Sequence, residues 1–150
     1  MMQMSLTELT CSATVCGICL ESSNNLSTKA VSSVLSHYQY INYLAYCMID
    51  KSSMAIALYL QEIRKELPYI RIAMIGNTSW YSKNPIKQMN DILLLRDEAD
   101  VYVHCPYPFE DYYYFFAMCC DYLLCDQSMI QRTFINKMRR ANPSLKLIEL

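Results

Sequence analysis

The sequence predicts an α/β fold, a single domain with a mainly parallel sheet and helices on both faces. Its 150 residues suit one domain and leave little room for a second. Hydrophobic residues make up 53% of the chain and charged residues 18%, a balance that supports a packed core. Short apolar runs alternate with helical segments along the chain, which is typical of parallel strands covered by helices.

The predicted domain spans residues 14–150, and residues 1–13 are expected to form an irregular amino-terminal segment. A short apolar run at 14–20 is the first predicted strand, and after a polar loop Ser27 can cap a helix. Residues 38–49 contain enough aromatic and β-branched side chains that their pattern leaves both helix and strand open.

The clearest helix covers residues 54–67, with Ser52 or Ser53 as its cap and Pro68 as its stop. Its apolar side chains recur at helical spacing and form one stripe, namely Ile56, Tyr59, Leu60, Ile63 and Leu67. A buried strand is expected at 70–75, followed by a loop at 80–84. Pro85 suits the first turn of a short helix that runs through Leu95.

The second half of the chain repeats the alternation of strands and helices. Strands are predicted at 101–105, 122–125 and 145–150, and helices at 109–120 and 128–141. Five adjacent aromatic residues at 112–116 would spread over all faces of the first of these helices. This run therefore cannot form one stacking platform, and we expect it to pack in part under neighbouring layers.

Composition excludes several classes of protein. Thirteen Lys and Arg against fourteen Asp and Glu give a net charge of -1, which argues against a nucleic-acid partner. No stretch of eighteen apolar residues occurs, so no membrane span is predicted in this chain. The chain has only two glycines, Gly17 and Gly76, which excludes both standard Gly-rich phosphate loops.

The eight cysteines include one C-x-x-C motif, formed by Cys16 and Cys19. A zinc site would need a second pair of ligands at comparable spacing, and none follows. The motif lies in an apolar run, so we expect two buried thiols and no metal site.

The two histidines do not complete a catalytic set. His104 ends a predicted strand, where a lone histidine is more often structural, and His37 has no assigned role.

Three segments in order, 70–77, 101–103 and 110–124, resemble the carboxyl-terminal half of α-1,2-fucosyltransferase-like glycosyltransferases. Ser128 and the pair Thr133-Phe134 stand where the family's last motif falls. Two features of the family pattern are missing: residues 14–20 contain no His or Arg, and Ile135-Asn136 replace an expected tryptophan pair.

The resemblance implies a Rossmann-like half of a GT-B-type fold that binds a nucleotide sugar. It implies an activity, present or former, that transfers fucose from a nucleotide-diphosphate sugar to a glycan acceptor, without a further cofactor. The donor diphosphate would meet Ser128, Arg132, Thr133 and Phe134, with Arg132 as the only cation of that segment. No catalytic residue is assigned.

Such a protein would work in the Golgi lumen, held by an anchor that this sequence does not include. The alternative from the residues alone is a cytoplasmic, non-catalytic α/β interaction module with reduced, buried cysteines.

Overall fold

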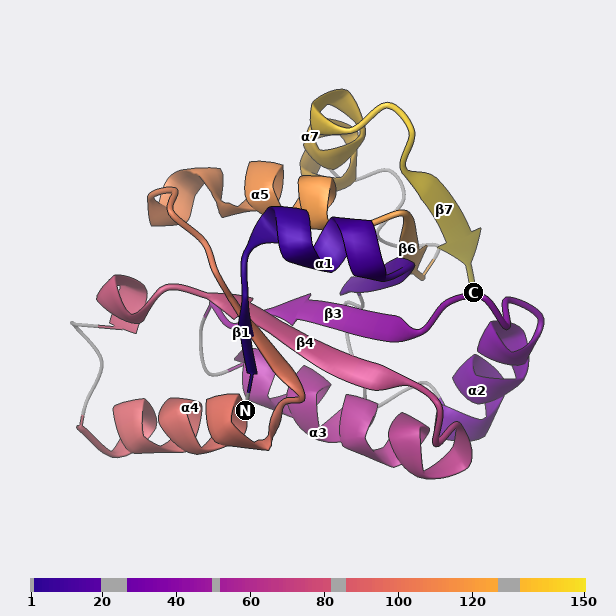
Figure 1. The fold of residues 1–150 in the computed structure, drawn as a ribbon, viewed down its shortest axis with the longest axis horizontal. Coiled ribbons are helices and arrows are strands. Elements are labelled where there is room, and N and C mark those ends of the chain that lie inside the picture. Colours follow the sequence, from indigo (N-terminus) through magenta and orange to yellow (C-terminus); the bar gives the residue numbers. More distant parts are fainter. Residues whose placement is uncertain (1, 20–26, 50–51, 82–85, 127–132) are drawn as a thin grey trace.

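A computed structural model describes residues 2–19, 27–49, 52–81, 86–126 and 133–150. Its centre is a seven-stranded sheet with strand order β1-β5-β4-β3-β2-β6-β7, in which every neighbouring pair is parallel (Figure 1). This Rossmann-like α/β arrangement confirms the predicted fold class. The strands are β1 (Met2–Met4), β2 (Val15–Cys19), β3 (Tyr43–Cys47), β4 (Arg71–Gly76), β5 (Val101–His104), β6 (Tyr122–Cys125) and β7 (Lys146–Glu149).

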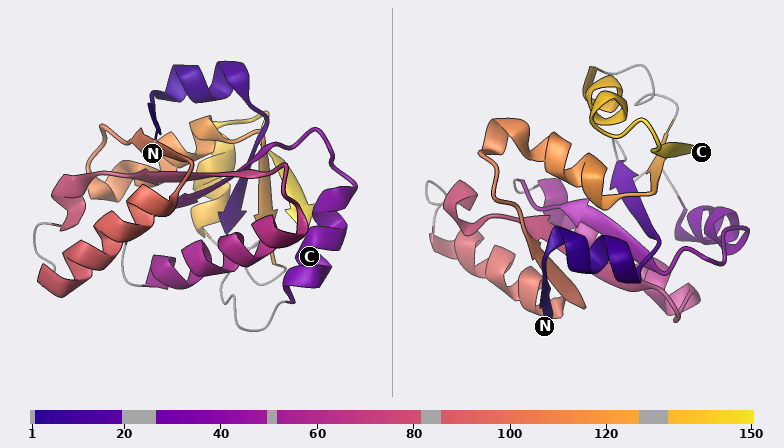
Figure 2. Two further views of the ribbon diagram at one scale, coloured as in Figure 1. Left: turned by 60° about the horizontal axis from the view of Figure 1, so that its bottom comes forward. Right: turned by 45° about the horizontal axis from the view of Figure 1, so that its top comes forward.

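Helices cover both faces of the sheet (Figure 2). On one face lie α2 (Thr28–Ser36), α3 (Ser52–Glu66) and α4 (Ile86–Glu98), and on the other α1 (Leu6–Ser12), α5 (Tyr112–Cys119) and α7 (Thr133–Ala141). Two short 3₁₀ helices, η2 (Thr78–Tyr81) and η3 (Phe109–Asp111), follow β4 and β5.

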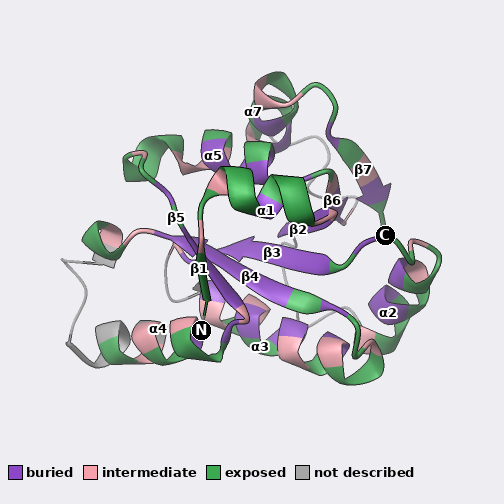
Figure 3. Cartoon of the chain, in the orientation of Figure 1, coloured by how far each residue is buried: buried purple, intermediate pink, exposed green. Residues whose placement is uncertain are grey.

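Most residues of the central strands are buried (Figure 3). Their side chains alternate between two cores, one on each face of the sheet. In β4, Ile72 and Met74 pack under the helices of one face, while Ala73 and Ile75 pack under those of the other. This burial on both sides explains why these strands have near-continuous apolar sequences.

The amino-terminal segment is ordered, so the expectation of an irregular segment over residues 1–13 is wrong. Met2 pairs with Val101 at the edge of the sheet, and Leu9 of α1 is fully buried. Ser5 caps α1 by accepting a hydrogen bond from the Glu8 backbone N–H at 3.2 Å. The Ser-x-x-Glu pattern of a capping box was therefore present in the sequence.

The other elements follow the sequence closely, with a few differences. Segment 38–49 resolves to the strand β3, and the helix expected at 109–120 divides into η3 and α5. Ser27 caps α2 as predicted, but Ser52 and Ser53 lie inside α3. Part of the loop expected at 80–84 belongs to η2. Residues 82–85, with Pro85, and the first part of the helix expected at 128–141 lie outside the described residues.

Gly17 lets α5 approach the middle of the sheet. A β-carbon at this position would lie 2.7 Å from Cys120 Sγ and 2.9 Å from Phe116 Cε1, both closer than real contacts allow. The sheet and α5 can therefore pack at this distance only because residue 17 has no side chain.

Candidate functional site

The strand order contains a topological switch point between β2 and β6. From β2 the chain crosses one face through α2 to β3, while from β6 it crosses the other face through α7 to β7. Neighbouring strands whose connections leave on opposite faces open a crevice at their carboxyl ends, which is the usual ligand position in open α/β sheets.

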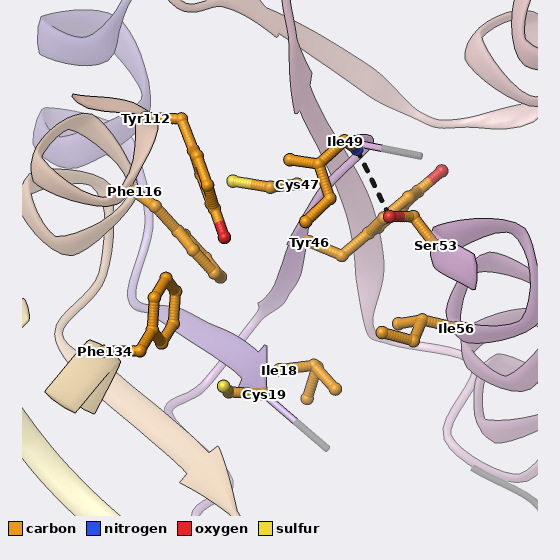
Figure 4. A pocket seen from close by; sticks show the side chains of 10 residues that line it. All are labelled: Ile18, Cys19, Tyr46, Cys47, Ile49, Ser53, Ile56, Tyr112, Phe116 and Phe134. Atoms are coloured by element: carbon orange, nitrogen blue, oxygen red, sulfur yellow. Dashed lines mark hydrogen bonds between the residues drawn. The ribbon is translucent and has the colours of Figure 1, made fainter. Parts of the chain in front are cut away.

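A pocket with a volume of about 200 Å³ lies at this edge of the sheet (Figure 4). Its walls come from the ends of β2 and β3, the first turns of α3, and the helices α5 and α7. The described lining residues are Ile18, Cys19, Tyr46, Cys47, Ile49, Ser53, Ile56, Tyr112, Phe116 and Phe134. This volume is below the range of about 300–1,000 Å³ for whole-ligand pockets, so it suits one ring-sized part of a ligand.

The described wall of the pocket is apolar and aromatic. None of the ten described lining residues carries a charged side chain. Ser53 Oγ accepts a hydrogen bond from the Ile49 backbone N–H at 3.2 Å, which links the residue after the end of β3 to the first turn of α3. This part of the site can therefore recognise a flat apolar or aromatic group, and it has no group to balance a phosphate charge.

The thiol of Cys47 and the phenol of Tyr46 stay neutral in this environment. Burial raises the pKa of the Cys47 thiol well above its ordinary value, and nearby Cys119, Cys105 and Cys19 raise it further. Burial likewise raises the pKa of the Tyr46 hydroxyl. A protonated thiol is a poor nucleophile, so the arrangement favours binding over covalent chemistry at Cys47.

The structure brings part of the expected donor site to this pocket. Phe134 lines it directly, with its ring centroid 5.8 Å from that of Tyr112, and Thr133 is the exposed first residue of α7. Ser128 and Arg132 lie outside the described residues.

The two thiols of the C-x-x-C motif face opposite sides of the sheet. Cys16 packs in the core under α2 and α3, whereas Cys19 packs in the core under α5. Both are buried, as expected, and this geometry prevents them from binding one metal ion together. Within the described ranges, no three His, Cys, Asp or Glu side chains are grouped as metal ligands.

Neither histidine contributes to the described pocket lining. His104 is the exposed last residue of β5, and His37 follows the last turn of α2.

Sequence reasoning missed the contribution of β3 and the start of α3 to the pocket. Tyr46, Cys47 and Ser53 lie in or beside the segment whose pattern left helix and strand open. The apolar run from Tyr43 to Ile49, which follows Asn42 and ends before Asp50 in the sequence, was the available sign of a buried strand whose carboxyl end reaches the site.

Comparisons with known proteins leave the family open: no family model matches this chain, and no curated protein matches it significantly. Among the helices that the structure describes, none combines the length and the apolar character needed to cross a membrane.

Proposed function

We propose that this chain is the donor-binding part of a glycosyltransferase-like protein that transfers, or formerly transferred, fucose from a nucleotide-diphosphate sugar to a glycan acceptor. The observation that most supports this proposal is the position of Phe134. This residue belongs to the last motif of the fucosyltransferase resemblance, and it lines the pocket at the switch point of the sheet. The resemblance and the general position of ligands in α/β folds thus favour the same place.

In this proposal the pocket binds the base of the donor, and the start of α7 binds its diphosphate. An aromatic base fits between the rings of Tyr112 and Phe134 on one side and Ile18 and Ile56 on the other. The diphosphate would meet the backbone N–H groups at the start of α7, because helix N-termini attract phosphate.

Turnover would require more than donor binding. A leaving diphosphate gains much of its stabilisation in the transition state from positioned cations. The described pocket wall supplies none, so Arg132 is the residue on which the charge balance of the proposal depends.

Calorimetric titration with guanosine diphosphate tests the proposal. Arg132→Ala should weaken binding about ten- to hundredfold, because it removes a charge-assisted contact of about 1.5–3 kcal/mol. Phe134→Ala should also weaken binding, by removing one wall of the base pocket. Arg140→Ala is the matched control, since Arg140 is an exposed cation at the other end of α7, and it should bind like the parent.

Absence of binding by the parent at millimolar guanosine diphosphate would refute the donor site. The alternative function, a cytoplasmic, non-catalytic interaction module, would then be favoured. If the parent and Arg132→Ala bind guanosine diphosphate with equal affinity, the chain binds the nucleotide but Arg132 does not contribute to the site.

A further inference from the structure

A continuous set of aromatic rings leads from the pocket onto the outer surface of the molecule. We call it the aromatic ladder; its members are Trp80, Phe109, Tyr112, Tyr113, Tyr114 and Phe134. Neighbouring ring centroids lie between 4.9 Å (Tyr113–Tyr114) and 6.5 Å (Tyr112–Tyr113) apart. Tyr112 and Phe134 belong both to the ladder and to the pocket wall, as Figure 4 shows for their side chains.

The ladder combines four segments of the chain. The run 112–116 does spread around α5, because Phe115 and Phe116 point into the core while Tyr112, Tyr113 and Tyr114 are partly or fully exposed. The surface forms only because η2, η3 and α7 add Trp80, Phe109 and Phe134 to those three tyrosines. The side chains of Phe109 and Tyr114 are 43% and 44% exposed, so this surface is open to a ligand.

The polar groups beside the rings favour a neutral or basic ligand. Glu110 and Asp111 are both exposed and lie between Phe109 and Tyr112 in the sequence. On the other side, Lys137 Nζ lies 5.2 Å from the ring centroid of Tyr113, where a cation–π contact partly occupies it. Carboxylates accept hydrogen bonds from hydroxyl groups and repel anions.

We propose that the aromatic ladder binds the glycan acceptor, as a neutral oligosaccharide whose sugar rings stack on the exposed aromatic side chains. The electron-rich face of an aromatic ring attracts the positively polarised C–H groups on the apolar face of a pyranose. The carboxylates of Glu110 and Asp111 accept hydrogen bonds from the sugar hydroxyls. This assignment rests on the proposed function, because continuity with the pocket would bring the acceptor to the donor.

The single tryptophan of the chain reports directly on this surface. Trp80 is the only tryptophan in the sequence, it contacts Phe109 and Tyr112, and its indole N–H donates to the Tyr107 carbonyl at 3.3 Å. Its fluorescence therefore changes when a ligand covers the ladder. The probe is lacto-N-tetraose, a neutral oligosaccharide that ends in galactose, titrated with and without guanosine diphosphate.

We expect lacto-N-tetraose to shift the emission of Trp80 at millimolar concentration. Phe109→Ala and Tyr114→Ala should each weaken binding about tenfold, because each removes a stacking surface worth roughly one factor of ten. Tyr69→Ala is the matched control. Tyr69 is 47% exposed but precedes β4, at the amino-terminal ends of the strands, so this variant should bind like the parent. A sialylated lacto-N-tetraose should bind more weakly, since its carboxylate meets Glu110 and Asp111.

Three results would overturn the acceptor surface. These are an unchanged Trp80 emission at millimolar oligosaccharide, equal losses in Phe109→Ala and Tyr69→Ala, and a response to a proline-rich basic peptide in place of the oligosaccharide. Circular dichroism of each variant checks that the fold is retained. Calorimetry with guanosine diphosphate separates the two proposals. Binding of the nucleotide without binding of the oligosaccharide would refute the acceptor surface alone. Binding of the oligosaccharide without binding of the nucleotide would refute the donor site alone.

Discussion

At the scale of single residues, the absence of a side chain at Gly17 sets the distance between α5 and the sheet. The nearest atoms to the missing β-carbon belong to Cys120 and to the ring of Phe116, and both residues are buried. Neither side chain can move without disturbing the core around it, because protein interiors are close-packed.

Gly17→Ala should lower the free energy of unfolding by about 1–3 kcal/mol, the usual cost of forcing an extra group into a packed core. Urea unfolding followed by circular dichroism measures it. Cys120→Ala removes the nearer of the two clashing side chains, so Gly17→Ala should cost less in that background than in the parent. Strictly additive effects of the two substitutions would contradict this explanation of Gly17.

At the scale of elements, Asn142 joins the ends of two helices on one face of the sheet. It follows α7, and its Nδ2 donates to the carbonyl oxygens of Ala117 at 2.9 Å and Cys120 at 3.0 Å, at the end of α5. Helix ends leave carbonyl groups without intrahelical partners, and here a side chain just beyond the neighbouring helix donates to two such carbonyls.

Asn142→Ala should therefore lower the free energy of unfolding by about 1–3 kcal/mol, since it removes the side-chain donor from the Cys120 carbonyl and leaves the Ala117 carbonyl only the Cys120 backbone N–H at 3.3 Å. The matched control is Asn136→Ala, an exposed position on α7 itself, where a change within about 0.5 kcal/mol is expected. Thermal or urea unfolding compares the two, and equal losses would show that the hydrogen bonds of Asn142 have no special weight.

The elements that the sequence predicted best are those with a strong local pattern. Strand β6 matches its predicted bounds, β5 differs by one residue at one end, and β4 and β7 differ by one residue at each end. The three strands β4, β5 and β6 were recognisable as short apolar runs. Strand β1 was missed because it is an edge strand of three residues that is mostly exposed, so it has no apolar run. Its pairing with β5 is a long-range contact that no local pattern encodes.

The candidate site was harder to predict than the fold. Phe134 could be named because it belongs to a motif, but Ile18, Tyr46 and Ile56 reach the same pocket from three separate elements. These residues meet only because of which strands are neighbours in the sheet. The alternation of strands and helices in the sequence predicts that the strands are parallel, but it does not predict their order in the sheet.

At the scale of the whole molecule, the buried thiols should make the free energy of unfolding decrease at alkaline pH. Burial raises the pKa of Cys16 from 9.0 to about 12, and burial also raises the pKa values of Cys47, Cys119 and Cys120. The unfolded chain would ionise these thiols near their ordinary pKa, while the folded chain keeps them protonated. Stability from this source is complete below about pH 9 and is lost as the pH rises toward the folded values.

The free energy of unfolding, measured by urea denaturation, should therefore be lower at pH 10 than at neutral pH. Above about pH 9 the loss approaches 1.4 kcal/mol per pH unit for each buried thiol. Cys16→Ala should reduce this pH dependence, whereas Cys11→Ala should leave it unchanged because Cys11 is exposed. A midpoint that stays constant up to pH 10 would show that the buried thiols ionise as easily in the folded protein as in the unfolded one.

The position of β1 also orders the events of synthesis on the ribosome. Residues Met2–Met4 are made before their partner, Val101–Val103, and Leu9 of α1 needs the core that α5 completes. The β2–β3 and β3–β4 pairs can form as soon as those strands emerge, each joined by a single helix. Strand β1 cannot pair until β5 has been made, so it docks after the β2–β3 and β3–β4 pairs, which lie between the two in the sequence.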